Sequence, residues 1–176
     1  MTPTTPNMRP FRALLASLVL SACAGDSTPK SDSAGANAPL PADAGTFAVA
    51  DFQQLRWLNG MWRGFMPDGG KFYERYRVID DSTMMMHAFP DSTFGTPSDS
   101  SRIMLRAGRV INDGGSARWV ATRLDSVGVD FTPHYGAPNR FTWARESETQ
   151  WSATMRWTDE SGRPQTRTYA LHKFGR

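Results

Sequence analysis

Short segments in which apolar and polar residues alternate run through the chain after Gly60, and they limit its fold more than any other feature. In 72–79, residues Phe72, Glu74, Tyr76 and Val78 share one parity and Tyr73, Arg75, Arg77 and Ile79 the other. Successive side chains of a strand point to opposite faces of a sheet, so this spacing predicts a β-strand. Further segments of this kind are 84–89, 102–111, 117–124, 127–131, 140–145, 150–157 and 165–173.

Turn residues separate these segments at short intervals. Asp80-Asp81, Gly114-Gly115 and the stretches 146–148 and 159–162 are typical of tight turns between strands. A meander of such strands avoids exposed edges most simply by closing into a barrel. We therefore expect an all-β, up-and-down barrel of about eight or nine antiparallel strands. The long irregular stretch 90–100 is predicted to be a loop that acts as a mobile lid.

A short helix is predicted before the first strand, over residues 51–60. Asp51 is a suitable N-cap, with Gln54 placed for a capping box, and Gly60 favours a stop. The apolar residues of this segment recur at helical spacing, on one stripe formed by Phe52, Leu55 and Leu58.

The N-terminus has the construction of a secretory signal. Arg9 and Arg12 precede the apolar stretch 13–20, which is shorter than the roughly 20 residues of a membrane-spanning helix. Leu20-Ser21-Ala22-Cys23 follows. This quartet resembles the lipobox of bacterial lipoproteins, in which signal peptidase II cuts before the Cys and the Cys is then acylated. The resemblance implies a signal peptide over 1–22 and a lipid anchor at Cys23.

Acylation of Cys23 predicts a protein of the cell envelope, bound to a membrane. One acyl chain holds a protein only marginally, whereas the two or three chains of a lipoprotein Cys, such as palmitate, anchor it stably. Cys23 is the single Cys, so no intramolecular disulfide can form. Ala24 follows the Cys instead of the Asp of an inner-membrane retention signal, which favours the outer membrane in a Gram-negative cell.

Residues 24–50 are rich in Ala, Ser, Pro, Asp and Gly, a composition that predicts a flexible tether. The predicted organisation is a signal peptide over 1–22, the lipidated Cys and tether over 23–50, and the barrel over 51–176. The net charge of +3 includes Arg9 and Arg12, which leave with the signal. The remaining chain is therefore almost neutral, which argues against nucleic acid as a partner.

Two stretches resemble a known family. In 55–64, Leu55, Trp57, Leu58, Gly60 and Trp62 match the L-x-W-L-x-G-x-W opening of the domain-of-unknown-function 6265 group, a set of calycin-like bacterial domains. The stretch 131–143 is similar to that group's P-x-H-D-F-P-x-R-I-x-Y segment, although it lacks the Asp-Phe pair. The resemblance implies a lipocalin-like barrel with Trp62 plugging one end, and it implies no established activity.

No motif for catalysis or phosphate binding is present, so the sequence gives no reason to assign an enzyme. His87, His134 and His172 could meet as a metal site if the barrel brings their strands together, although ordinary strand or loop histidines explain them as well. A weaker resemblance to nitrobindin-type haem barrels makes His172 the candidate haem ligand. We otherwise expect no cofactor.

A ligand cavity is the functional site that the strand pattern favours. Alternation places Trp151 and Trp157 on one face of their strand and Glu74 on the same face as Tyr76, as core packing alone would also require. The residues predicted to bind the ligand are Glu74, Tyr76, Met85, Arg140, Trp151 and Trp157. Arg140, or else Arg123, is the expected ion-pair partner of Glu74, and Arg140 the group that binds an acidic head group.

The resulting interpretation is a lipid-anchored envelope protein whose barrel holds a small apolar or amphipathic molecule. The alternative is a barrel with a filled core whose outer surface binds another envelope protein; a haem protein or a weak hydrolase is a third reading. The volume of the interior separates the first two, because a cavity of a few hundred Å³ suits a ligand and a filled core does not.

Overall fold

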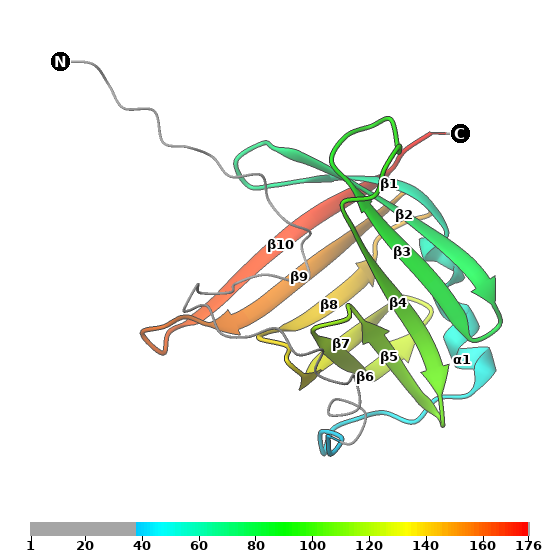
Figure 1. Cartoon of the computed structure of the whole chain (residues 1–176), viewed down its shortest axis with the longest axis vertical. Coiled ribbons are helices and arrows are strands. Elements are labelled where there is room, and N and C mark those ends of the chain that lie inside the picture. The colour runs from blue at the N-terminus through cyan, green and yellow to red at the C-terminus, as the bar shows by residue number, and fades with distance from the viewer. Residues whose placement is uncertain (1–37, 176) are drawn as a thin grey trace, which may run out of the picture.

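The structure is a computed structural model that describes residues 38–175, so the predicted signal peptide, Cys23 and most of the predicted tether lie outside it. The described chain is a closed antiparallel barrel of ten strands with a short helix before the first (Figure 1). The helical elements are α1 (Val49–Gln53) and the 3-10 helix η1 (Gln54–Leu58). The strands are β1 (Gly60–Phe65), β2 (Lys71–Asp80), β3 (Thr83–Phe89), β4 (Asp99–Arg106), β5 (Arg109–Asp113), β6 (Arg118–Asp125), β7 (Gly128–Tyr135), β8 (Arg140–Arg145), β9 (Gln150–Thr158) and β10 (Pro164–Lys173).

The topology is the predicted up-and-down meander. Each strand pairs with the next one along the chain, and β1 pairs with β10 to close the barrel, with Trp62 opposite Lys173. Trp62 also lies opposite Glu74 of β2. The first and last strands therefore hold each other, and no strand edge of the barrel is left open. Neither α1 nor η1, the helical elements of residues 38–175, has the length and hydrophobicity that a membrane-spanning helix needs.

The expected number of strands, about eight or nine, is too low for two local reasons. The predicted strand 102–111 is two strands, because the chain reverses at Ala107 and Gly108, with φ of 48° and 73°. Positive φ at both central residues is typical of the primed turns that join hairpin strands. The other addition is β1, whose Gly60 was expected to end a helix and instead begins a strand.

The predicted helix is present, but it begins earlier and is capped differently. Its N-cap is Ala48, and Asp51 Oδ2 accepts the Ala48 backbone N–H at 2.8 Å from within the first turn. Placing Asp51 at the N-cap was therefore wrong. The apolar stripe is confirmed, since Phe52, Leu55 and Leu58 are buried. Trp62 is buried beneath η1 and donates its indole N–H to the Leu58 carbonyl at 2.6 Å.

The last residues of the predicted tether are attached to the barrel. The Gly45 N–H donates to the Ala121 carbonyl at 2.9 Å, and the Phe47 N–H donates to the Gly108 carbonyl at 2.8 Å. Arg109 Nη1 donates to the carbonyls of Ala44 and Gly45. Residues 44–47 therefore already contact the barrel ahead of Asp51, where the barrel domain was expected to begin.

Aromatic rings fill most of the interior. Trp151 is at the centre, with ring centroids 6.0 Å from Trp62, 6.0 Å from Tyr76 and 5.7 Å from Trp143, all in edge-on arrangements. Phe141 continues this stack, 5.4 Å from Trp143. Edge-to-face packing stabilises such rings beyond their burial alone. The interior is therefore a packed core with little free space.

The loop between β3 and β4 does not cover this interior. Its Phe94 has a φ of 52° and packs against Phe89 at 5.0 Å and against Tyr73 at 5.9 Å. Tyr73 has the opposite parity to the inward-facing Glu74, so this contact is on the outer wall. The predicted lid is thus packed on the outside of the barrel, away from the residues that line the cavity described next.

Candidate functional site

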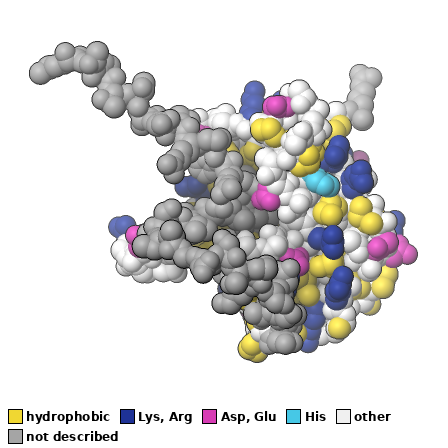
Figure 2. All heavy atoms as spheres, in the orientation of Figure 1, with side chains coloured by type: hydrophobic (Ala, Val, Ile, Leu, Met, Phe, Trp, Pro, Cys, Tyr) yellow, Lys and Arg dark blue, Asp and Glu magenta, His cyan; other side chains and the backbone are white. Residues whose placement is uncertain are grey.

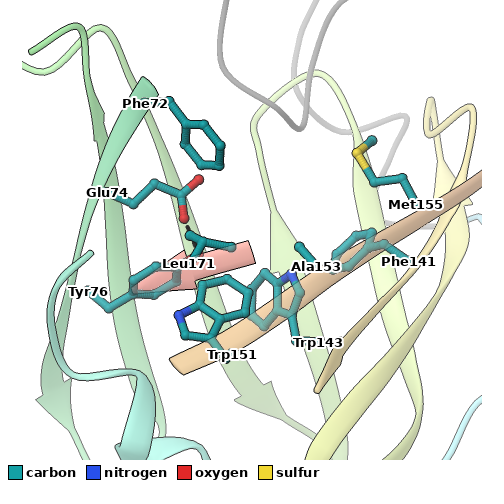
Figure 3. Close-up of a pocket in the computed structure, with 9 residues that line it drawn as sticks. All are labelled: Phe72, Glu74, Tyr76, Phe141, Trp143, Trp151, Ala153, Met155 and Leu171. Carbon is teal, nitrogen blue, oxygen red and sulfur yellow. Dashed lines mark hydrogen bonds between the residues drawn. The ribbon is translucent and has the colours of Figure 1, made fainter. Parts of the chain in front are cut away.

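A small cavity lies inside the barrel between β2, β8, β9 and β10 (Figure 3). Its floor is formed by rings of Tyr76, Trp143 and Trp151, while Phe72 and Met155 lie at the far side from this floor. The complete lining is Phe72, Glu74, Tyr76, Phe141, Trp143, Trp151, Ala153, Met155 and Leu171. Glu74 is the one charged side chain in this set, so the wall is otherwise apolar or aromatic.

The cavity is far smaller than expected. The hollow together with its open side has an empty volume of about 320 Å³, but the centre of a water molecule can move through only about 20 Å³ of it. About 10–15 Å³ of such space holds one water molecule. The interior is therefore closer to the filled core of the alternative interpretation than to a ligand cavity of a few hundred Å³. The site admits a group the size of a water molecule, and a bulkier one requires Phe72 or Met155 to move.

Glu74 and Tyr76 form a buried polar pair on the cavity wall. Both are on the inner face of β2, with exposed fractions of 5% and 1%. Tyr76 Oη donates a hydrogen bond to Glu74 Oε2 at 2.9 Å (Figure 3). None of the described ion pairs includes Glu74. The carboxyl thus has a hydroxyl for a partner and no cation.

Burial changes the proton affinity of both members of this pair. It raises the pKa of Glu74 to about 7, although the hydrogen bond from Tyr76 opposes the increase. The pKa of Tyr76 is raised well above 10, first by burial and then by the charge of Glu74. Glu74 therefore changes its protonation state near neutral pH, while Tyr76 keeps its proton and remains a donor.

The predicted ion-pair partners of Glu74 are both outside the barrel. Arg140 is exposed and lies 3.5 Å from Asp43, because the neighbouring Phe141 takes the inward position on β8. Arg123 instead pairs with Asp125 and Asp130, the latter at 2.7 Å. The predicted Glu74–Arg140 pair is therefore wrong, and Arg140 does not line the cavity in which it was expected to meet an acidic head group.

Two other predicted binding residues do not line the cavity. Met85 lies opposite Arg77 and points outward, whereas Met84 and Met86 are buried inside the barrel. Trp157 is half-buried farther along β9, where the guanidinium of Arg167 lies 5.7 Å from its ring centroid. Glu74, Tyr76 and Trp151 are the predicted residues that the structure does bring together.

The sequence interpretation missed Phe72, Phe141, Trp143 and Leu171 as lining residues. Alternation alone could have identified Phe141 and Trp143, which flank an outward-facing residue on β8. Gly64 is a less visible contributor. A Cβ placed there would be 1.9 Å from the Phe72 ring, so the missing side chain leaves the space in which this ring lies.

The histidines do not converge. His172 lies on the outer face of β10, with its ring 5.6 Å from that of Phe65. His87 faces outward from β3, and its pKa is lowered by burial and by the nearby charges of Arg75 and Arg77. Within residues 38–175 no group of three His, Cys, Asp or Glu could hold a metal ion, so the three-His site is not formed.

Comparison with known proteins adds little to this description. No protein-family model matches the chain, and no curated protein matches it. One similar solved structure, EF1p2_mFAP2b bound to DFHBI, is 15% identical over 69% of this chain and 98% of its own, with a TM-score of 0.37. A redesigned β-barrel, b11L5F_LGL, is 18% identical over 70% of this chain and 96% of its own, with a TM-score of 0.36. Both likenesses are distant, so the fold is established by the strand pairing of this chain and not by the comparison.

Proposed function

We propose that this protein is a lipid-anchored envelope barrel that binds a small amphipathic molecule at the cavity beside Glu74. The small free volume by itself favours the filled-barrel alternative. The proposal is carried instead by the buried Glu74–Tyr76 pair on a wall that is otherwise apolar, and it requires Phe72 or Met155 to move when the ligand binds. Ligand sites typically combine an apolar lining with a few polar groups that fix orientation. A pair that served packing alone would be replaced at lower cost by two apolar side chains.

The ligand would place its polar end against Glu74 and its apolar part among the rings. Phe72 and Met155 are half-buried at the side of the cavity away from the aromatic floor. Met is flexible and fills irregular space, so Met155 can adapt to ligands of different shape. Movement of these two side chains would admit a longer apolar group without a change in the strands.

The anchor at Cys23 is the second part of the proposal and comes from the sequence. A barrel held at a membrane by the predicted tether would meet amphipathic molecules that partition into the lipid. The outer membrane remains the favoured location, because Ala24 follows the Cys.

Fluorescence of the cavity tryptophans tests binding directly, because Trp143 and Trp151 form part of the wall. The full chain would be titrated with octan-1-ol and octylamine, and we expect saturable quenching by at least one of them. Ala153→Leu, which adds atoms to the cavity wall, should weaken binding by at least tenfold. Thr154→Leu, one residue along β9 and facing outward, is the matched control. Absence of binding by the intact, folded chain would remove the proposal.

The outer wall of the barrel supports a second candidate, the protein-binding role. The Arg63 guanidinium lies 5.1 Å from the Phe65 ring centroid, and that of Arg75 lies 5.0 Å from Phe89. Neither Arg pairs with an acidic side chain among the described ion pairs. Figure 2 shows several basic side chains on the face of the barrel where β3 and β4 lie, and β4 contributes the exposed Arg102 and Arg106. Such a surface suits an acidic protein partner.

A photo-crosslinking amino acid separates the two candidates in cells. Placed at exposed Arg77, on the same face as Arg75, it should capture one defined protein if the outer wall binds a partner. The same amino acid at Thr154 should capture none. If neither position gives a crosslink and octylamine or octan-1-ol binds, the ligand role alone stands.

A further inference from the structure

We infer that the cavity takes an organic cation, a primary amine whose ammonium group meets the Glu74 carboxylate while its apolar chain extends between Phe72 and Met155. The inference rests on the binding function proposed above and names the chemical class of the ligand. The charge of Glu74, the geometry of its carboxyl group and the size of the cavity each support this inference.

The charge of Glu74 is uncompensated inside the barrel. A carboxylate in the interior requires a partner or a proton. The arginines expected to supply the opposite charge, Arg140 and Arg123, form ion pairs outside. The Tyr76 hydroxyl supplies one hydrogen bond and no positive charge. A ligand cation would supply the positive charge that none of the described residues places beside Glu74.

The geometry leaves one carboxylate oxygen for the ligand. Oε2 of Glu74 accepts the hydrogen bond from Tyr76, whereas Oε1 has no hydrogen-bond partner among the described residues. Figure 3 shows the carboxyl group between the Phe72 ring and the rings of the floor. An ammonium group carries several donors, so it can bond Oε1 and still accommodate a water molecule.

The surrounding rings suit a cation as well as an apolar chain. Tyr76, Trp143 and Trp151 meet edge to face, with centroids 5.9 Å apart for Tyr76–Trp143 and 5.7 Å apart for Trp143–Trp151. The faces of aromatic rings attract cations, and Trp does so most strongly. No Lys, Arg or His side chain is part of the lining to repel one.

The size of the cavity favours a primary amine. The free space fits a group about as large as a water molecule, which an ammonium head group matches. A trimethylammonium group is much bulkier, and it would have to displace rings of the packed floor. An anion is disfavoured at neutral pH because it would lie beside a second negative charge in a poorly solvated site.

Binding of an amine should depend on the ionisation of Glu74, whose pKa is about 7. The other ionisable groups nearby are Tyr76 on its own strand and two side chains of β10: Tyr169, packed against Phe72, and Lys173, which lies 4.6 Å from the Trp62 ring. The lining residues of β8 and β9 carry no charge, nor do Met86 and Ala88, the inward residues of β3 beside this pair. The affinity should therefore fall about tenfold for each pH unit below about 7 and level off above it.

Three eight-carbon probes test this with the full chain: octylamine, octan-1-ol and octanoate. We expect octylamine to bind at least tenfold more tightly than octan-1-ol at pH 8, and octanoate to bind more weakly than either. Only the amine should lose affinity between pH 7 and pH 5. Glu74→Gln should lower amine affinity to that of the alcohol and remove its pH dependence. Glu148→Gln, at an exposed position, should change neither.

The outcomes distinguish this inference from the proposed function. Equal binding of the amine and the alcohol, unaffected by Glu74→Gln, would overturn the cation and leave a site for neutral amphipathic molecules. Tighter binding of octanoate would overturn it in the same way. If none of the probes binds a chain with an intact melting transition, the ligand-binding function itself fails.

Discussion

Replacing Glu74 by Gln should make the protein more stable at alkaline pH, although the residue is buried and hydrogen-bonded. The change keeps the size of the side chain, and the amide oxygen can still accept the hydrogen bond from Tyr76. It removes the charge that the barrel interior does not neutralise. The variant therefore isolates the cost of ionising this carboxyl in the folded state.

The magnitude follows from the two proton affinities of the carboxyl. Its pKa is about 7 in the folded chain and 4.5 as the ordinary value. Each pH unit of difference corresponds to 1.36 kcal/mol, so ionisation should destabilise the fold by about 3 kcal/mol. Because the pKa of Glu74 is raised in the folded state, the contribution of this residue to stability is fully present below about pH 4.5, falls as the pH rises, and is lost above about pH 7.

Other groups titrate in nearby ranges, but their effects cancel in the comparison of variant with wild type. The lowered pKa of Asp159, about 2, adds stability that is complete by about pH 5. His87 has a lowered pKa, so its contribution to stability increases as the pH rises toward its ordinary value of 6.5 and is complete above it, in opposition to Glu74. Both groups are present in both proteins. The difference between the two unfolding free energies therefore reports Glu74 alone.

Urea unfolding of the full chain, followed by tryptophan fluorescence between about pH 4.5 and 8.5, measures this difference. The variant and the wild type should be similar at the acidic end, and the variant should be more stable by about 3 kcal/mol at the alkaline end. Glu148→Gln, on an exposed turn, should follow the wild type throughout. A constant difference between the Glu74 variant and the wild type across the range would refute the argument, because it would show that Glu74 does not ionise at a raised pKa.

Three further substitutions test the fold and the anchor. Trp62→Ala should lower the free energy of unfolding by about 3–5 kcal/mol, since it empties a buried position and removes the hydrogen bond to the Leu58 carbonyl. Urea titrations measure this loss, and an unchanged midpoint would place Trp62 outside the core. Gly64→Ala should displace the Phe72 ring, which lies 1.9 Å from the added Cβ, and lower the melting temperature by several degrees; a stability equal to that of wild type would show that the ring moves freely. Cys23→Ser should abolish labelling of the protein by radioactive palmitate and release it from membranes. Globomycin, which inhibits signal peptidase II, should cause the precursor of the wild-type protein to accumulate. Lipid attachment in the variant would exclude Cys23 as the anchor.

Alternation in the sequence was sufficient to assign the inner faces of single strands. It correctly placed Glu74 with Tyr76, and Trp151 with Ala153, on buried faces. It also assigned the outward side of β8, since Arg140 has the opposite parity to Phe141. The prediction of Arg140 as a binding residue followed the family resemblance against this parity, and the structure favours the local pattern.

Alternation could not determine which of two faces is inside when both are apolar. Met84, Met85 and Met86 are equivalent by sequence, and pairing with β2 decides that Met85 points outward, opposite Arg77. The turn at Ala107 was not predicted, because Ala is seldom found at positive φ and Gly108 alone does not indicate a hairpin. Both errors depend on partner strands, which a single segment does not specify.

The environment of Glu74 required the complete barrel. The residues that line its cavity come from β2, β8, β9 and β10, and the small free volume depends on how their rings pack. The free-energy cost of ionising Glu74 in this cavity indicates whether packing alone can explain a carboxylate there. A loss of about 3 kcal/mol at neutral to alkaline pH is large beside the 5–15 kcal/mol that stabilises a typical domain. An apolar residue at the same position would avoid the loss, so packing does not account for a carboxylate there. A ligand cation would recover the lost stability on binding, because it lowers the pKa of Glu74 and thereby stabilises the folded state at the pH where the free protein is weakest.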